Sequence, residues 1–457
     1  MKKELLILVC LLIGFISCKN ENTNIVTPTD IQIEWAEAEV GVLIHFDMPV
    51  FVPEYKWRNF GTHPDASVFN PTELNTDQWL ETASKLGAKY AVLVAKHCSG
   101  FSLWQTEAHE YSVKNSPWKD GKGDIVKDFV ESCKKYGIKP GIYASTSANG
   151  YLHVDNPGLV KPGAPVTQEE YNAIVVKQLT ELWSNYGDLF EIWFDGGVLS
   201  KERGGANILP LVEKLQPKVI AFQGPFGHKN LIRWVGNEEG VAPYPCWATA
   251  DSSTNADGTI VVEGLNGNPY AKFWCPGESD FTLRWNRSFQ GGWFWHAGQD
   301  TMMFTTGQLM KKYVTSVGRN TNMLLGIVID DRGLVPDADV KRIEEFGDKI
   351  KQNFGAPFKS VSGKGKVLSI SFDTPVSIDR VVIQEDIKLG ERILSYTIKG
   401  VKDNNETIEL AKGSNVGHKH IDIFAPVNLK EIIFETDSCK AIPHIRNFAV
   451  YETLLTN

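Results

Sequence analysis

The stretch Tyr90-Ala-Val-Leu-Val-Ala-Lys-His97 is a short apolar run that ends in two polar residues. A continuous apolar run of this length is typical of a strand that is buried on both faces, as in a parallel sheet. Similar runs occur at wide intervals along the chain, over residues 41–44, 141–143, 189–194 and 218–222. Together these runs predict a parallel sheet that is covered on both sides.

Helical patterns lie between these runs. Residues 76–86 open on a Thr-Asp pair that suits a helix start, and their apolar residues recur at helical spacing. Residues 124–136 and 169–186 show the same pattern. The alternation of strands and helices predicts an α/β fold with a (β/α)8-like, TIM-type barrel. In such barrels the chemically active residues directly follow the strands.

The pattern changes after a helix predicted over residues 337–354. Gly355-Ala356-Pro357 interrupts the chain, and apolar residues then alternate with a period of two, in runs separated by turn residues. We therefore expect a catalytic barrel over residues 32–355 and an all-β sandwich over residues 356–457.

The first residues have the features of a targeting signal. Lys2 and Lys3 precede an apolar run over residues 5–16, which is shorter than the roughly 20 residues that span a bilayer. Phe15-Ile-Ser-Cys18 resembles a bacterial lipobox, so we expect a signal peptide over residues 1–18, a lipid on Cys18 and a polar tether over residues 19–31. Plain secretion is the alternative, because Phe15 replaces the usual Leu. Either way we expect export, to the periplasm or the cell surface.

Composition and charge exclude several function classes. The net charge of −8 offers no basic field for nucleic acid. Seven cysteines are present without a CxxC pair, which argues against a zinc cluster or a disulfide framework. No cofactor motif and no metal site are predicted, since His45 and His97 lack a third ligand at a convincing spacing. The 13 Trp residues raise carbohydrate as a candidate ligand, because aromatic faces stack on sugar rings, whereas composition alone favours a large aromatic core.

Three polar residues follow predicted strands directly. They are His45, His97 and Asp195. A carboxylate at the end of a buried strand is costly unless it has a role or a partner, although Asp195-Gly-Gly is also a common turn. For each histidine, a hydrogen-bonded core residue is the alternative to a functional one.

Several motifs follow one another along the chain, at residues 41–46, 95–104, 193–196, 291–296 and 316–326. In this order they resemble the motifs of glycoside hydrolase family 29, the retaining α-L-fucosidases, in which the second is usually KHHDGFxLW. The resemblance covers roughly residues 32–454.

The resemblance implies an exo-α-L-fucosidase that removes terminal L-fucose by double displacement, with Asp195 as the nucleophile. Retaining hydrolysis needs a second carboxyl group about 5 Å away. Residues 233–238, RWVGNE, resemble the motif of a subfamily that prefers α-1,3- and α-1,4-linked fucose, which makes Glu238 the acid/base; Glu278 is the alternative. The implied fucose-binding residues are His45, Trp57, His97, Trp193, Trp293 and Glu278. The implied partner is a fucosylated glycan, and no oligomeric state is indicated.

The chain departs from this family pattern around the sugar. Cys98 and Ser99 stand where the family has His-Asp, and Lys56 precedes Trp57 in place of Glu. Cysteine is a poor substitute for a hydrogen-bonding histidine. Two alternatives therefore stay open: a glycan-binding or weakly active protein on a fucosidase scaffold, and a glycosidase for a related L-sugar.

Overall fold

The computed structural model describes residues 25–254, 260–263 and 265–453. The predicted signal peptide (1–18), its lipidation site Cys18 and residues 19–24 of the predicted tether lie outside the described residues. Within the described ranges, no helix combines the length and the apolar character that a membrane crossing requires.

Eight parallel strands close into a barrel, which confirms the predicted fold class. Their order around the barrel is β1-β13-β12-β8-β7-β6-β3-β2, so β13 pairs with β1 and closes the ring. The strands are β1 (Val40–His45), β2 (Tyr90–Lys96), β3 (Lys139–Ala144), β6 (Glu191–Trp193), β7 (Ile220–Phe222), β8 (Leu231–Trp234), β12 (Gly277–Thr282) and β13 (Thr321–Val328). Because all are parallel, their carboxyl ends meet at one end of the barrel, here called the mouth.

The helix α1 (Asp30–Ala38) packs against the amino end of the barrel, where the Trp35 N–H donates to the buried Glu191 of β6. The helices that cover the outside of the barrel are α2 (Thr76–Leu86), α3 (Ile125–Tyr136), α4 (Gln168–Ser184), α5 (Leu209–Leu215), α6 (Thr306–Ser316) and α7 (Asp337–Phe354). The predicted helices over residues 76–86 and 337–354 are confirmed. The expected Thr-Asp cap of α2 is wrong by one residue: the side chain of Asn75 accepts the free N–H groups of Asp77 and Gln78.

Two small sheets replace regular connections. β4 (Val154–Asp155) pairs with β5 (Leu159–Val160) after β3. Between β8 and β12 the chain forms an antiparallel sheet of β9 (Thr249–Thr254), β10 (Ile260–Glu263) and β11 (Phe273–Trp274). This side of the barrel is therefore covered by strands and loops.

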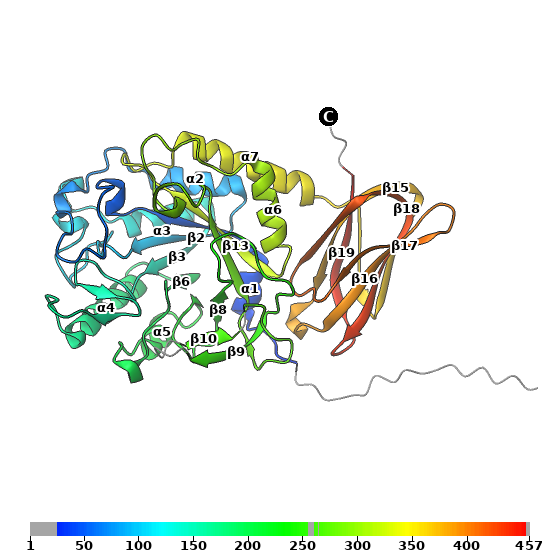
Figure 1. Ribbon diagram of the computed structural model, residues 1–457, viewed down its shortest axis with the longest axis horizontal. Helices are drawn as coiled ribbons and strands as arrows, with labels where there is room; N and C mark the ends of the chain where they lie inside the picture. The colour runs from blue at the N-terminus through cyan, green and yellow to red at the C-terminus, as the bar shows by residue number, and fades with distance from the viewer. Residues whose placement is uncertain (1–24, 255–259, 264, 454–457) are drawn as a thin grey trace, which may run out of the picture.

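The C-terminal domain is an antiparallel sheet, which confirms the expected all-β module (Figure 1). Register shifts interrupt the pairing of its two longest strands, β15 and β18, and the sheet encloses a core that includes Ile378, Tyr396, Phe434 and Phe448. The strand order is β14-β19-β15-β18-β16-β17. The strands are β14 (Lys359–Lys364), β15 (Val367–Glu385), β16 (Ile393–Val401), β17 (Thr407–Gly413), β18 (His420–Cys439) and β19 (His444–Glu452).

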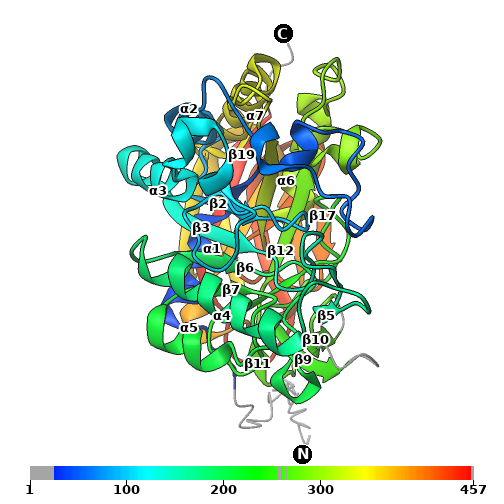
Figure 2. The same ribbon diagram turned by 90° about the vertical axis from the view of Figure 1, so that its left-hand side faces the viewer.

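The two domains meet at the amino ends of the barrel strands. Glu39, just before β1, contacts His418 at 3.0 Å and forms an ion pair with Lys419. Asn320, just before β13, donates to the carboxylate of the buried Glu391. The C-terminal domain thus lies behind the barrel in Figure 2, and the mouth stays free of these contacts.

Candidate active site

Asp195 lies at the mouth, two residues beyond the end of β6. The Tyr143 hydroxyl, on β3, donates to its carboxylate Oδ2 at 3.1 Å, and the Ser147 hydroxyl donates to its backbone carbonyl at 2.6 Å. Burial raises the pKa of the Asp195 carboxyl, while the hydrogen bond from Tyr143 acts in the opposite direction. Asp195 is therefore a fixed carboxylate that keeps some access to solvent.

A stack of rings runs across four neighbouring strands and holds Tyr143 in place. The ring centroids of His97 and Tyr143 are 5.8 Å apart, those of Tyr143 and Trp193 are 5.3 Å apart, and those of Trp193 and Phe222 are 3.8 Å apart. Such stacking fixes ring positions as well as burying area. Trp193 is itself buried, and its N–H donates to Glu278, so it lies beneath the mouth rather than at its surface.

Glu238 lies in the loop that follows β8, and its side chain is exposed. The indole N–H of Trp293 donates to its Oε2 at 3.2 Å. Its backbone φ is +41°, in the left-handed region that residues other than glycine rarely adopt. Backbone strain of this kind often occurs at functional sites. Its neighbour Glu239 is also exposed, and its side chain lacks a comparable contact among the interactions of the described residues.

A chain of contacts joins the two carboxylates. The Trp293 ring lies 4.8 Å from the His45 ring, and the His45 ring lies 6.5 Å from the ring of Tyr143, which bonds Asp195. Asp195 and Glu238 therefore both lie at the mouth of the barrel, linked through the rings of Tyr143, His45 and Trp293.

Trp293 owes its position to a glycine. A Cβ atom on Gly326, in β13, would lie 2.6 Å from the Trp293 ring, which is too close for any side chain. The ring therefore packs directly on the β13 backbone, and its N–H is directed at Glu238.

A cavity of about 330 Å³ adjoins the mouth. Trp57 and His97, both predicted to bind sugar, line it together with Asp47, Ser99 and Phe294. The cavity therefore brings the aromatic and polar groups of several loops to one place, as small-molecule sites require.

Asp47 is a buried carboxylate that sequence reasoning missed. Asp47 follows β1 just as Asp195 follows β6. The criterion that singled out Asp195, a carboxylate directly after a buried strand, therefore also identifies Asp47. The Ser99 hydroxyl donates to its Oδ1 at 2.6 Å, and its Oδ2 lies 3.9 Å from His97 Nδ1. Burial raises the pKa of Asp47 to about 7. The family pattern has a carboxylate at the position of Ser99, and here Asp47 supplies one beside it.

A sequence model of the family Alpha-L-fucosidase matches residues 23–354. The chain belongs to the α-L-fucosidase family. It is thus a glycoside hydrolase, as the motifs predict. The Arabidopsis thaliana protein Alpha-L-fucosidase 1 is 30% identical over 93% of this chain and 87% of the plant protein.

Two solved structures of related proteins have the same fold as this fucosidase. A crystal structure from Bacteroides thetaiotaomicron VPI-5482 has a TM-score of 0.87 and is 36% identical, covering 94% of this chain and 100% of that chain. A Ruminococcus gnavus GH29 fucosidase in complex with fucose shares the fold, with a TM-score of 0.78 at 23% identity over 94% of this chain and 95% of that chain.

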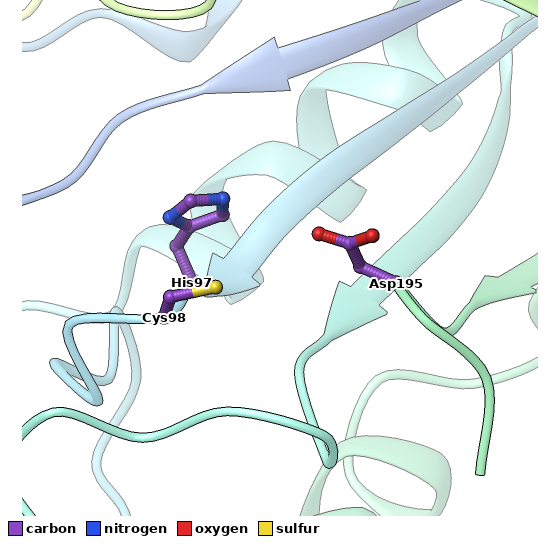
Figure 3. A group of neighbouring side chains, drawn as sticks. All are labelled: His97, Cys98 and Asp195. Carbon is purple, nitrogen blue, oxygen red and sulfur yellow. The ribbon is translucent and has the colours of Figure 1, made fainter. Parts of the chain in front are cut away.

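Cys98 stands in this fucosidase where the family pattern has histidine. Its side chain is buried, and Figure 3 shows the sulfur and the Asp195 carboxylate pointing toward each other. Burial and the neighbouring charge of Asp195 raise the pKa of the thiol, so Cys98 is a neutral thiol in the protein as described. It offers a weaker donor beside the carboxylate than a histidine would.

Glu278 lies inside the barrel and does not reach the mouth. It is fully buried, its Oε1 accepts from the Tyr90 hydroxyl at 2.6 Å, and its Oε2 accepts from Trp193 Nε1 at 2.9 Å. The carboxyl of Glu191 lies beside it, and burial raises the pKa of both groups. Of the roles considered from the sequence, this placement favours the structural one: Glu278 holds the rings below the site.

We expect Glu278→Ala to lower the free energy of unfolding by about 3 kcal/mol, because it leaves the Tyr90 hydroxyl and the Trp193 N–H buried without an acceptor. Denaturant unfolding of the full chain measures this effect. The matched control is Glu131→Ala on the exposed side of α3, which should leave the unfolding midpoint unchanged. Equal midpoints for the two variants would rule out the structural role.

Proposed function

We propose that this fucosidase is a retaining exo-enzyme that removes terminal α-1,3- or α-1,4-linked L-fucose from oligosaccharides or glycoconjugates. One observation carries the proposal: Asp195, held by Tyr143, and Glu238, held by Trp293, both lie at the mouth of the barrel and are linked through the ring of His45. Two carboxyl groups on either side of a glycosidic bond are what double displacement requires.

The first step forms a covalent intermediate. A carboxylate oxygen of Asp195 attacks the anomeric carbon of fucose while the glycosidic C–O bond breaks, and Glu238 gives its proton to the leaving oxygen. Tyr143 keeps the carboxylate oriented throughout. In the second step Glu238 takes a proton from water, whose oxygen attacks the anomeric carbon and releases Asp195 with the sugar configuration retained.

Two neutral histidines are suited to hold the sugar hydroxyls. Burial lowers the pKa of His97 to about 4, and burial together with the nearby His97 lowers the pKa of His45 well below its usual value. A neutral imidazole offers one donor and one acceptor. Among the described residues, His45 Nδ1 is buried without a hydrogen-bond partner. The fucose bound in the Ruminococcus gnavus fucosidase supports fucose as the sugar in this site.

The motif around Glu238 supports the linkage preference. We expect this fucosidase to hydrolyse a Lewis-type trisaccharide faster, by kcat/KM, than nitrophenyl α-L-fucoside. The measurement is fucose release from both substrates at equal enzyme concentration. Faster turnover of the aryl fucoside would count against the α-1,3/1,4 assignment while leaving the fucosidase activity established.

Cys98 favours a second candidate, a fucosidase-like enzyme whose best substrate is a related α-linked L-sugar. The thiol replaces a histidine beside Asp195, so the contacts to one sugar hydroxyl differ from the family pattern. A panel of aryl glycosides of L-fucose and other L-sugars separates the two candidates. The highest kcat/KM on L-fucose supports the first.

We further propose that the protein is exported and anchored through Cys18. The lipobox-like segment supports this proposal. Incorporation of a labelled fatty acid into the wild-type chain, and its loss in Cys18→Ala, is the expected result in bacterial expression. A wild-type chain recovered unlabelled from the medium would point to plain secretion.

A further inference from the structure

Three side chains of different ligand types converge beside the proposed nucleophile. The ligand atoms of His97, Cys98 and Asp195 all lie within 4.8 Å of one another. In Figure 3, the Cys98 sulfur and the Asp195 carboxylate point toward each other from the ends of two strands, and the His97 ring stands next to them. The sequence pattern gave no third ligand for His97, because the fold brings Asp195 to it from a distant β/α unit.

We propose that these three residues bind a thiophilic divalent cation, with Zn²⁺ as the reference ion, and that the bound ion blocks the enzyme. Zinc takes thiolate sulfur, imidazole nitrogen and carboxylate oxygen at about 2.0–2.3 Å in a tetrahedral arrangement. Such bond lengths place ligand atoms roughly 3.5 Å apart. Small side-chain rotations on fixed strand ends therefore suffice to close the site.

The chemistry of the donors favours a soft ion. A thiolate with an imidazole selects zinc and similar transition metals over magnesium or calcium, which prefer oxygen ligands alone. Zinc binds imidazole in its neutral form and cysteine as a thiolate, so the thiol of Cys98 loses its proton to solvent when the ion binds. Three protein ligands leave a fourth position for water, as in open zinc sites.

The surroundings of the site are compatible with a cation. The carboxyl group of Asp47 lies 3.9 Å from His97 Nδ1 and offers a further oxygen beside the site. Tyr143 occupies Oδ2 of Asp195 through its hydroxyl, and a carboxylate oxygen accepts more than one partner. Asp195 is partly exposed at the mouth, so the ion has an entry path.

Blocking follows from the role of Asp195, so this half of the inference rests on the proposed function. An oxygen lone pair that coordinates the cation is not free to attack the anomeric carbon. The ion also occupies the space beside His97 that the sugar would need. Fucose and the ion should therefore compete, whereas formation of the metal site itself does not depend on hydrolysis.

Cobalt provides a direct test of the site on the full, EDTA-treated chain. Co²⁺ occupies zinc sites, and a thiolate ligand gives it a charge-transfer absorption. We expect this absorption with the wild-type chain, its loss in Cys98→Ser, and its retention in Cys439→Ser, whose thiol lies in the C-terminal domain. Excess Zn²⁺ should remove it, and His97→Gln should weaken Co²⁺ binding by about tenfold or more.

Inhibition is measured in parallel by fucose release from nitrophenyl fucoside. We expect Zn²⁺ to inhibit the wild-type chain, EDTA to restore the rate, and the inhibition constant to rise about tenfold or more in Cys98→Ser, each variant being compared with its own metal-free rate. Circular dichroism confirms that the variants are folded.

Each outcome tests the metal site, its blocking role or the proposed function separately. An absent Co²⁺ thiolate absorption, or the same absorption in folded Cys98→Ser, overturns the site. Cobalt binding at Cys98 without inhibition by Zn²⁺ overturns the blocking role alone. A chain that binds Co²⁺ through Cys98 but hydrolyses no fucoside leaves the metal site standing and removes the proposed function.

Discussion

Asp195→Asn is expected to lower kcat/KM for α-L-fucosides by about 10⁴-fold or more, the scale seen when a nucleophile that acts as part of a unit is removed. The amide has nearly the size of the carboxylate and still accepts the Tyr143 hydrogen bond through its oxygen. It cannot form the glycosyl ester on which the second step depends. The loss should therefore appear in kcat, while fucose binding measured by calorimetry stays close to that of the wild type.

The matched control is Asp188→Asn, an exposed aspartate in the loop before β6. It carries the same chemical change in the same β/α unit and should keep the wild-type rate. An Asp195→Asn variant that retains more than a tenth of the wild-type activity would remove Asp195 from the nucleophile role. A protein with no activity in any variant, but with binding to fucosylated glycans, would instead identify the glycan-binding alternative.

A small external nucleophile distinguishes a missing nucleophile from a general loss of structure. Asp195→Gly opens space where the carboxylate stood, and azide can enter it with an activated aryl fucoside. Azide nitrogen then bonds the anomeric carbon as the aryl oxygen leaves, and because this attack occurs once, the product is the β-fucosyl azide. Recovery of activity with this inverted product is expected for the nucleophile position.

The barrel could be predicted from the sequence because most of its strands are continuous apolar runs. The predicted runs do not include β8, β12 or β13, and for β12 the reason is physical: its residues Glu278, Ser279 and Asp280 are polar yet buried. Alternate residues of a strand point the same way, so Glu278 and Asp280 share one face. Both accept hydrogen bonds from tryptophans, Glu278 from the buried Trp193 and Asp280 from the partly buried Trp234. A pattern that equates burial with apolar residues misses such a strand.

Site residues could be predicted where their position after a strand or their motif marked them. They could not be predicted where their role depends on contacts that form only in the folded chain. Asp195 follows a buried strand, and Glu238 lies in a recognisable motif. Tyr143, by contrast, ends an apolar run that indicates only core, and its hydroxyl contact with Asp195 depends on the pairing of β3 with β6. Cys98 stands out in the sequence only as a departure from the family's histidine, because its closeness to Asp195 exists only in the closed barrel.

Glu238→Gln should lower kcat/KM for fucosylated oligosaccharides by about 10²- to 10⁴-fold, the usual contribution of a general acid. A sugar alcohol is a poor leaving group and needs the proton that Gln lacks. Nitrophenolate leaves without one, so formation of the intermediate from nitrophenyl fucoside should be affected far less. The amide still accepts the Trp293 N–H, which keeps the loop in place.

Glu239→Gln is the control for this leaving-group effect. Glu239 is the exposed neighbour of Glu238, and its substitution removes the same charge. It should hydrolyse both substrates at wild-type rates. Similar losses on the oligosaccharide and the aryl fucoside in Glu238→Gln would mean that the residue shapes the site without donating a proton. Glu278 is fully buried and both of its carboxylate oxygens accept hydrogen bonds, and Glu239 lacks the contact with Trp293. If Glu238→Gln alone makes the rate depend steeply on the leaving group, the general acid is therefore Glu238.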